Sequence, residues 1–170
     1  MDFSFERCDI QHLDDLCAIQ DEAFASLEDE RLLRRNSREM LASCLEAPHV
    51  TIGAFSGGEI AAFGVLYVAG NSGESLGRKL GLEEDEVMRT ANLKLFIVRP
   101  GYRGHGLQRQ LIEILEKEAA SVGIARLCSS VSPLNMHSAR NFTALGYTLK
   151  GSATLYGGLE RDIYCKELNS

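Results

Sequence analysis

The sequence predicts an α/β domain built on one central, twisted, mixed and largely antiparallel sheet with helices on both faces. One observation is the stretch of residues 92–123, which reads as a buried strand, a glycine turn and an amphipathic helix. The other is the order of the remaining segments, in which strand-like runs bounded by glycine alternate with segments of helical spacing. No internal repeat or linker interrupts this order, so we expect a single domain spanning residues 1–170.

The composition excludes several classes of protein. A hydrophobic content of 45% and a charged content of 25% are typical of globular domains, and the net charge of −6 argues against a nucleic-acid partner. The five cysteines are scattered without a CxxC pair, so we expect reduced cysteines, and neither disulfides nor a metal site. The N-terminus lacks the features of a signal peptide, and no apolar run is long enough to span a bilayer. We therefore expect a cytoplasmic protein that has no membrane partner.

The first third of the chain predicts a short strand and two helices. Residues 1–7 alternate as a first strand, and Asp9 is expected to cap a helix. The inward face of that helix is predicted to be Ile10, Leu13, Cys17 and Phe24. Ser37 is expected to cap the second helix, which Pro48 would end.

The next segments predict a hairpin followed by a loop. Residues 49–55 and 59–68 are strand-like and are joined by Ser56-Gly57-Gly58. Residues 69–91 contain four glycines and the acidic run 83–86, which we interpret as a loop with a short helix near residues 76–80. After the central stretch we expect a strand at 125–131, a helix at 135–145, and closing strands at 147–156 and 162–168.

The glycine turn within residues 103–108 predicts a phosphate site. Pro100 ends regular strand pairing, and Gly104 and Gly106 precede the helix, whose first N–H groups have no partner within the helix. A nucleotide P-loop would need a Gly-Lys-Ser/Thr ending, which is absent. A dinucleotide fingerprint would need three glycines in an early βαβ unit, whereas this turn lies in the middle of the chain. The pyrophosphate of coenzyme A is the third candidate.

The run Val-Arg-Pro-Gly-Tyr-Arg-Gly-His-Gly-Leu at residues 98–107 resembles a signature of the GNAT superfamily of N-acetyltransferases, V-x-P-x-x-R-G-x-G before a helix. A second family motif, Asn-x-x-(Ala/Ser) followed by Gly-(Phe/Tyr), matches residues 135–138 and 146–147. The resemblance implies a GNAT-like fold and acetyl-CoA as co-substrate. It also implies direct transfer of the acetyl group to an amine of a small molecule or a protein. A homodimer formed through the closing strands is a further expectation from the family.

The resemblance also implies which residues bind acetyl-CoA. Backbone amides of the turn would cradle the pyrophosphate, the end of the central strand would align the pantetheine arm, and the start of the following helix would bond that arm. The residues concerned are Ile97, Val98, Arg103, Gly104, His105, Gly106, Leu107, Gln108, Asn135 and Ser138. The family often has Gly or Ala at the position of Gln108, so this residue departs from the pattern.

The catalytic groups are not evident from the sequence. Many family members use a tyrosine as general acid at the position where this chain has Phe142, which we interpret as a core residue. Weak substitutes are Ser138, Tyr156 and Glu86. The acidic run at residues 28–30 could attract a cationic amine, although a solvated surface is the simpler interpretation. Because the acid is missing, a catalytically silent acyl-CoA-binding sensor or partner module is the alternative function.

Overall fold

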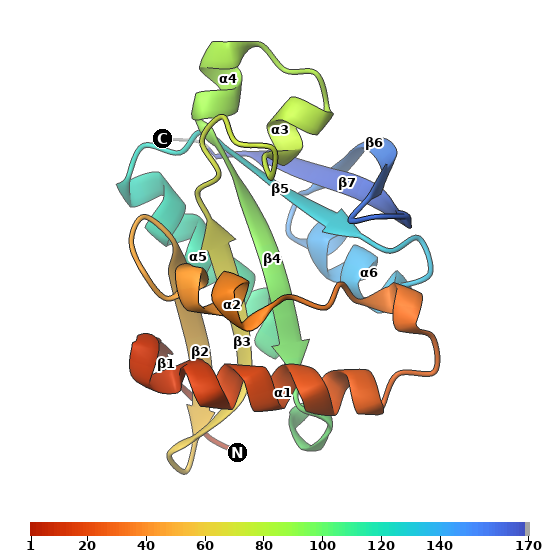
Figure 1. The fold of residues 1–170 in the computed structure, drawn as a ribbon. Helices are drawn as coiled ribbons and strands as arrows, with labels where there is room; N and C mark the ends of the chain where they lie inside the picture. The colour runs from red at the N-terminus through yellow and green to blue at the C-terminus, as the bar shows by residue number, and fades with distance from the viewer. Residues whose placement is uncertain (169–170) are drawn as a thin grey trace.

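The computed structural model describes residues 1–168 and shows an α/β fold built on a seven-stranded sheet, as predicted (Figure 1). The strand order is β1-β2-β3-β4-β5-β7-β6. Within the described residues, β4 and β5 are parallel neighbours, and the other pairs are antiparallel. The strands are β1 (Ser4–Arg7), β2 (Val50–Ser56), β3 (Glu59–Tyr67), β4 (Thr90–Val98), β5 (Arg126–Val131), β6 (Thr148–Leu155) and β7 (Leu159–Glu167).

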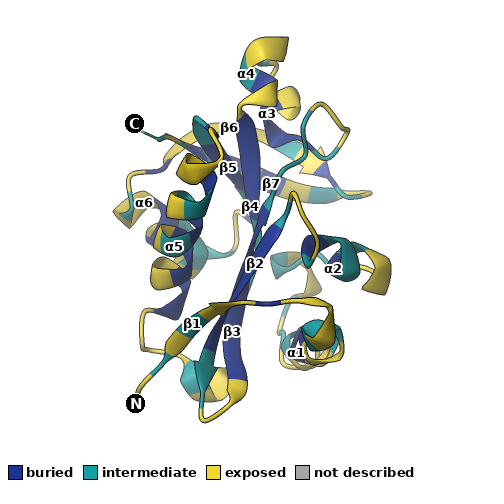
Figure 2. Cartoon of the chain, turned by 90° about the vertical axis from the view of Figure 1, so that its left-hand side faces the viewer, coloured by how far each residue is buried: buried dark blue, intermediate teal, exposed yellow. Residues whose placement is uncertain are grey.

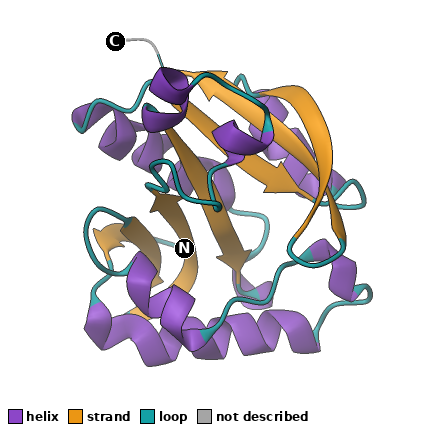
Figure 3. Ribbon diagram, turned by 45° about the horizontal axis from the view of Figure 1, so that its top comes forward, coloured by secondary structure: helices purple, strands orange, loops and turns teal. Residues whose placement is uncertain are grey.

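Helices cover both faces of the sheet. One face carries α1 and α2 and the other carries α5 and α6, and the edge-on view in Figure 2 shows the sheet between them. The two short helices α3 and α4 lie together at one end of the sheet (Figures 1 and 3). The helices are α1 (Leu13–Ala25), α2 (Arg38–Cys44), α3 (Leu76–Lys79), α4 (Glu84–Met88), α5 (Leu107–Ser121) and α6 (Met136–Ala144). Within residues 1–168, none of them has the length and apolar character needed to cross a bilayer.

Two apolar layers enclose the central strands, which are dark along most of their length in Figure 2. On one side, Leu111, Ile112 and Leu115 of α5 pack against β2, β3 and β4. On the other side, Leu16 and Ile19 of α1 pack in a second layer that includes residues of α2, β3 and β4. Residues 60–66 of β3 are all buried, which explains why this strand reads as a continuous apolar run.

The predicted inward face of the first helix is wrong. Asp9 caps a 3₁₀ turn (Ile10–His12) instead of the α-helix, which begins at Leu13. Because a 3₁₀ turn has three residues per turn, it shifts the phase of the side chains that follow. The buried positions are Leu16, Ile19 and Gln20, whereas Ile10 is 53% exposed and Leu13, Cys17 and Phe24 are only partly buried.

The boundaries of the later segments are mostly confirmed, with two corrections. The helix at residues 76–80 and the hairpin turn are present, and Ser37 caps α2 by accepting from the Met40 amide. The acidic run is not a loop, because Glu84, Asp85 and Glu86 form the first turn of α4, where the helix dipole favours negative charge. Strand β7 begins at residue 159, earlier than predicted, since the glycine pair 157–158 suffices to turn the chain.

All five cysteines are free in the structure. Four of them are buried, and Cys17 on α1 is partly exposed. The expectation that Cys17 belongs to the core is therefore wrong. The partial exposure of Cys17 has the same cause as the exposure of Ile10, which is the shift in helical phase at the 3₁₀ turn.

A β-bulge at Leu95 interrupts the regular alternation of β4. Val65 pairs with Lys94 and Phe63 pairs with Ile97, so one residue of β3 faces two residues of β4. Leu95 has a φ of +62°, in the left-handed region that β-strands do not use. The extra residue redirects the side chains beyond it. Phe96 joins the layer against α5, and Leu95 and Ile97 join the layer against α1.

Gly64 is the residue of β3 that lies opposite this bulge. A methyl group on Gly64 would lie 2.4 Å from the Cε1 atom of Phe96, closer than packed carbon atoms approach. The bulge therefore depends on a glycine 31 residues before it in the chain.

The parallel strands β4 and β5 separate beyond the middle of the sheet. They pair only over residues 90–92 and 126–128. The next contact is made by a side chain, since Ser129 Oγ donates to the Leu93 carbonyl over 2.9 Å. Within residues 1–168, no ladder pair joins the two strands after this point. The carboxyl end of β4 is therefore open towards β5.

Substitution Gly64→Ala should lower the free energy of unfolding by about 1–3 kcal/mol, because the added methyl group overpacks Phe96. Urea unfolding of Gly64→Ala, Phe96→Ala and the double variant measures this. The double variant should be less destabilised than the sum of the single variants, because the two side chains are in contact. Additive effects would show that Gly64 and Phe96 are not coupled.

Candidate functional site

The turn before α5 is held open by two glycines in the left-handed region. Gly104 has a φ of +85° and Gly106 a φ of +69°. Gly106 is the N-cap of α5, and no side chain caps that helix end. The side chain of Gln110 supports the turn from outside, donating to the carbonyls of His105 and Gly106 over 3.0 and 3.1 Å. The backbone of the turn is therefore fixed while its amides are left uncapped.

Six consecutive N–H groups, those of residues 104–109, have no hydrogen-bond acceptor within the described residues. The first amide of α5 that is paired is Gln110 N, which donates to Gly106 O over 3.2 Å. Unpaired amides at a helix N-terminus, with the positive end of the helix dipole behind them, form an anion site. These amides are the groups on which the predicted phosphate site relies.

These amides border a cavity of about 430 Å³, called here the first cavity. It extends from the turn to the end of β4 and the start of α6. Nine of the ten predicted coenzyme A residues line it: Ile97, Val98, Arg103, Gly104, Gly106, Leu107, Gln108, Asn135 and Ser138. The exception is His105, whose exposed ring instead packs against Phe3, with the ring centres 5.3 Å apart.

Gln108, which departs from the family pattern, joins α5 to α6. Its Nε2 atom donates to Ser138 Oγ over 2.9 Å, and its Oε1 accepts from Asn141 Nδ2 over 3.0 Å. Asn141 Oδ1 in turn accepts from Arg109 Nε over 2.8 Å. The side chain of Gln108 is therefore turned towards α6, and its backbone amide stays free. Sequence reasoning did not find Asn141, because nothing in the spacing marks it as a partner of Gln108.

Asn135 is the N-cap of α6. Its Oδ1 atom accepts from the Ser138 amide over 3.1 Å, so the carboxamide is oriented by the helix end. Its Nδ2 group has no acceptor within residues 1–168 and remains available to a ligand in the first cavity.

A second cavity of about 100 Å³ adjoins the first at the open end of β4. The two cavities share Leu32, Leu33, Phe96, Ile97, Asn135 and Ser138. The second cavity extends towards the segment before α2 and towards β5 and β7. Its further lining includes Arg34, Asn36, Lys94, Ser129, Ser130, Tyr156 and Arg161.

The weak catalytic candidates lie in different places. Ser138 lines both cavities and Tyr156 lines the second, where its Oη atom is 2.7 Å from Ser130 Oγ. Glu86 lines neither cavity and instead forms an ion pair with Arg126 at 3.3 Å, which leaves it without geometric support as a base. Phe142 is 1% exposed and contacts the edges of the Phe96 and Tyr147 rings, in agreement with its interpretation as a core residue.

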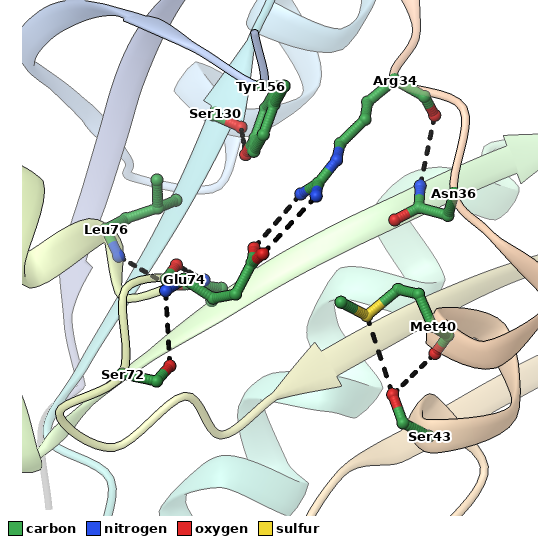
Figure 4. A network of polar contacts seen from close by, with 10 residues as sticks. Arg34, Asn36, Met40, Ser43, Ser72, Glu74, Leu76, Ser130 and Tyr156 are labelled. Atoms are coloured by element: carbon green, nitrogen blue, oxygen red, sulfur yellow. Dashed lines mark hydrogen bonds and ion pairs between the residues drawn. The ribbon is translucent and has the colours of Figure 1, made fainter.

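Arg34 and Glu74 form an ion pair beside Tyr156 (Figure 4). The Arg34 guanidinium lies 4.0 Å from the centre of the Tyr156 ring and 3.2 Å from Glu74 Oε2. Burial acts to raise the pKa of Glu74, but the hydrogen bonds and charge of Arg34 outweigh it, so the pKa lies below its usual value. Glu74 is therefore ionised and neutralises Arg34. Tyr156 has a φ of +54°, which places a strained residue at this cavity.

Lys94 is a buried cation in β4. Its Nζ atom has no hydrogen-bond partner within the described residues and lies 4.7 Å from the centre of the Tyr67 ring. Burial lowers the pKa of Lys94. The sequence showed this residue only as an interruption of an apolar strand.

The acidic run at residues 28–30 lines neither cavity. Asp29 caps a 3₁₀ turn and pairs with Arg31 at 2.7 Å, and the side-chain and backbone hydrogen bonds from Arg31 lower its pKa to about 2. Glu28 and Glu30 are exposed. The run is a solvated surface in this structure. Within residues 1–168, no cluster of three or more potential metal ligands is present.

The model of the acetyltransferase (GNAT) family matches residues 13–147, so the chain belongs to this family. It is similar in structure to yncA of Salmonella typhimurium, a putative acetyltransferase determined with acetyl-CoA. The TM-score is 0.75 and the identity 16%, over 100% of this chain and 96% of the other. The ribosomal-protein-S18-alanine N-acetyltransferase of Escherichia coli is also similar in structure, with a TM-score of 0.73 and 19% identity. The match covers 99% of this chain and 96% of the other.

A third similar structure is a putative acetyltransferase of Acinetobacter baylyi, with a TM-score of 0.74 and 20% identity over 98% and 92% of the two chains. No curated protein sequence matches this chain. At these identities, the likeness to solved structures establishes the fold. The family establishes acetyl transfer as the general class of activity.

Substitution Lys94→Met should raise the free energy of unfolding at pH 7, by roughly the 1–4 kcal/mol seen when buried charges are replaced by apolar side chains. The pKa of Lys94 is lower in the folded chain than its ordinary 10.5. At a pH between the folded and the unfolded pKa of Lys94, the unfolded chain binds more protons than the folded chain, so the free energy of unfolding of the wild type rises with pH. The difference in stability between Lys94→Met and the wild type should therefore shrink as the pH rises. Urea unfolding from pH 7 to 10.5 measures both effects.

The matched control is Lys117→Met, which removes an exposed lysine of α5. Its stability should match that of the wild type within about 0.5 kcal/mol. A Lys94→Met variant that is less stable than the wild type at every pH would contradict the assignment of Lys94 as an uncompensated buried charge.

Proposed function

We propose that this protein is an acetyl-CoA-dependent N-acetyltransferase that transfers the acetyl group directly to an amine of a small molecule or a protein. The observation that supports this most strongly is the row of unpaired amides at residues 104–109, which borders the first cavity. That cavity meets a second one at the open end of β4, so an acyl donor and an acceptor could approach each other there.

The residues present fit coenzyme A. The turn amides supply donors for a pyrophosphate, and Gly104 has open space where a side chain would project. The edge of β4 at Ile97 and Val98, which is not paired with β5, and the free Nδ2 group of Asn135 fit the amides of a pantetheine arm. His105 is outside the cavity, so its role in this proposal is limited to its backbone amide.

Acetyl transfer breaks the bond between the acyl carbon and sulfur and forms a bond from the same carbon to nitrogen. The amine loses a proton and the sulfur gains one. We propose that Tyr156, hydrogen-bonded to Ser130, donates the proton, and that the Ser138 hydroxyl contacts the acyl donor where the cavities meet. Phe142 packs edge-on against Phe96 and Tyr147 and has no group that could donate a proton.

A silent acyl-CoA-binding module is the second candidate function. One observation favours it: neither cavity is lined by an aspartate or glutamate within the described residues. No carboxylate is therefore in place to accept the proton of the amine. Release of free thiol from acetyl-CoA with a panel of amines separates the two functions, since only the enzyme releases thiol.

Substitution Gly106→Glu should reduce coenzyme A affinity at least about 100-fold, because it places a carboxylate at the amides that would bind pyrophosphate. The matched control is Gly123→Glu, which introduces the same residue at a glycine with φ +81° at the opposite end of α5. Calorimetric titration with coenzyme A measures both. Equal affinity in the two folded variants would contradict the proposed cofactor site.

Substitution Tyr156→Phe should lower kcat on the order of 100-fold while leaving the Kd for coenzyme A unchanged, as expected for the loss of a general acid. Tyr164→Phe is the control, because Tyr164 lies on β7 and lines neither cavity. Steady-state kinetics with a saturating amine distinguishes them. If Tyr156→Phe retains wild-type kcat, Tyr156 is not the proton donor.

A further inference from the structure

The second cavity carries more positive charge than its surroundings neutralise. Three cationic side chains line it, those of Arg34, Lys94 and Arg161, and no acidic residue of the described chain does. Arg34 is neutralised by Glu74. The other two have no carboxylate within ion-pair distance among residues 1–168. A buried charge without a counterion costs folding free energy unless a ligand supplies the partner.

Arg161 is one of these two cations, and little of its surface is exposed. It projects from β7 and is 4% exposed. Its side chain makes one hydrogen bond within the described residues, donating to the carbonyl of the neighbouring Glu160 over 2.9 Å. A guanidinium group has five N–H donors, so most of its donors are left for another partner. Its planar fork matches the two oxygens of a carboxylate.

Asn36 provides an unused acceptor in the same cavity. It is 5% exposed, and its Oδ1 atom has no donor among residues 1–168. Gln20 holds the Asn36 backbone through two hydrogen bonds of 2.8 and 2.9 Å, and Asn36 Nδ2 donates to the Arg34 carbonyl over 3.2 Å. In Figure 4 the free oxygen points away from that carbonyl. A rigid, buried and unpaired oxygen fits an N–H donor of a ligand.

We propose that the second cavity binds the acceptor as a small amine that also carries an oxyanion, with amino acids as the substrate class. Arg161 binds the oxyanion, Lys94 adds positive charge to the same cavity, and Asn36 accepts a hydrogen bond from the amine. This inference rests on the proposed function, because it assigns the acceptor of that reaction. It replaces the idea that the acidic residues 28–30 attract a cationic amine.

The size of the cavity supports a small acceptor. Its volume of about 100 Å³ is well below the roughly 300–1,000 Å³ of pockets that enclose drug-sized ligands. A lysine side chain or an N-terminus of a protein would bring positive charge next to Arg161 and Lys94 without a compensating anion. Like charges in a buried site disfavour such a ligand.

The test compares matched pairs of acceptors. Each of a set of L-amino acids is assayed beside its C-terminal amide, which keeps the side chain and the amine but removes the negative charge, and a set of aminoalkylphosphonates is added. The acids should exceed their amides in kcat/KM by about tenfold to a hundredfold, as expected for hydrogen bonds to a charged group. Preference for the phosphonates would identify the oxyanion as a phosphonate. Equal rates for acids and amides would overturn the proposal.

Arg161→Met tests the residue itself. The ratio of kcat/KM for an acid to that for its amide should fall towards one, whereas a merely structural loss would lower both rates together and leave the ratio unchanged. The Kd for coenzyme A should stay as in the wild type, and Arg161→Lys should restore part of the ratio by keeping the charge. Lys117→Met, on the exposed surface of α5, should leave the ratio at the wild-type value. An unchanged ratio in Arg161→Met would overturn the assignment.

Binding measurements separate this inference from the proposed function. Calorimetric titration of amino acids and their amides into the complex with coenzyme A requires no turnover. If acids bind more tightly than amides and no thiol is released with any amine, the transferase is contradicted and the oxyanion site stands. If thiol is released with amides and acids alike, and acids show no binding advantage, the transferase stands and the oxyanion site is contradicted.

Discussion

The β-bulge at Leu95 is the constraint on which the site depends. It requires Gly64 on the neighbouring strand, because Phe96 lies against that residue. Beyond the bulge, Phe96 faces α5 and Ile97 faces α1, and both side chains line the two cavities. The bulge acts together with the separation of β4 from β5, which leaves the end of the central strand unpaired on that side. A regular, fully paired β4 would close the position where the cavities meet.

In a chain with a net charge of −6, we propose two sites for anions. In the first cavity the positive character comes from backbone amides and the dipole of α5, and in the second it comes from Lys94 and Arg161. Net charge therefore says little about a site whose donors are local and fixed. The two sites differ in their effect on the stability of the fold. The amides are uncharged and border the first cavity, whereas buried cations without a counterion lower the stability of the fold in the absence of a ligand.

The sequence predicted the fold class and the first cavity well, because both depend on local patterns. The glycine turn, the helix behind it and Asn135 lie within short segments whose spacing is readable, and Phe142 was correctly interpreted as core. The second cavity could not be predicted, since its residues come from four separate segments that only the fold brings together. Nothing local marks Arg161 as buried. The phase of the first helix was missed because a 3₁₀ turn precedes it.

A crystal structure of the complex with coenzyme A would locate both the pyrophosphate and the sulfur. We expect phosphate oxygens within hydrogen-bond distance of the amides of residues 104–109, and the sulfur between β4 and β5, where the two cavities meet. Phosphates bound away from that turn, or a sulfur on the far side of α6, would contradict this expectation.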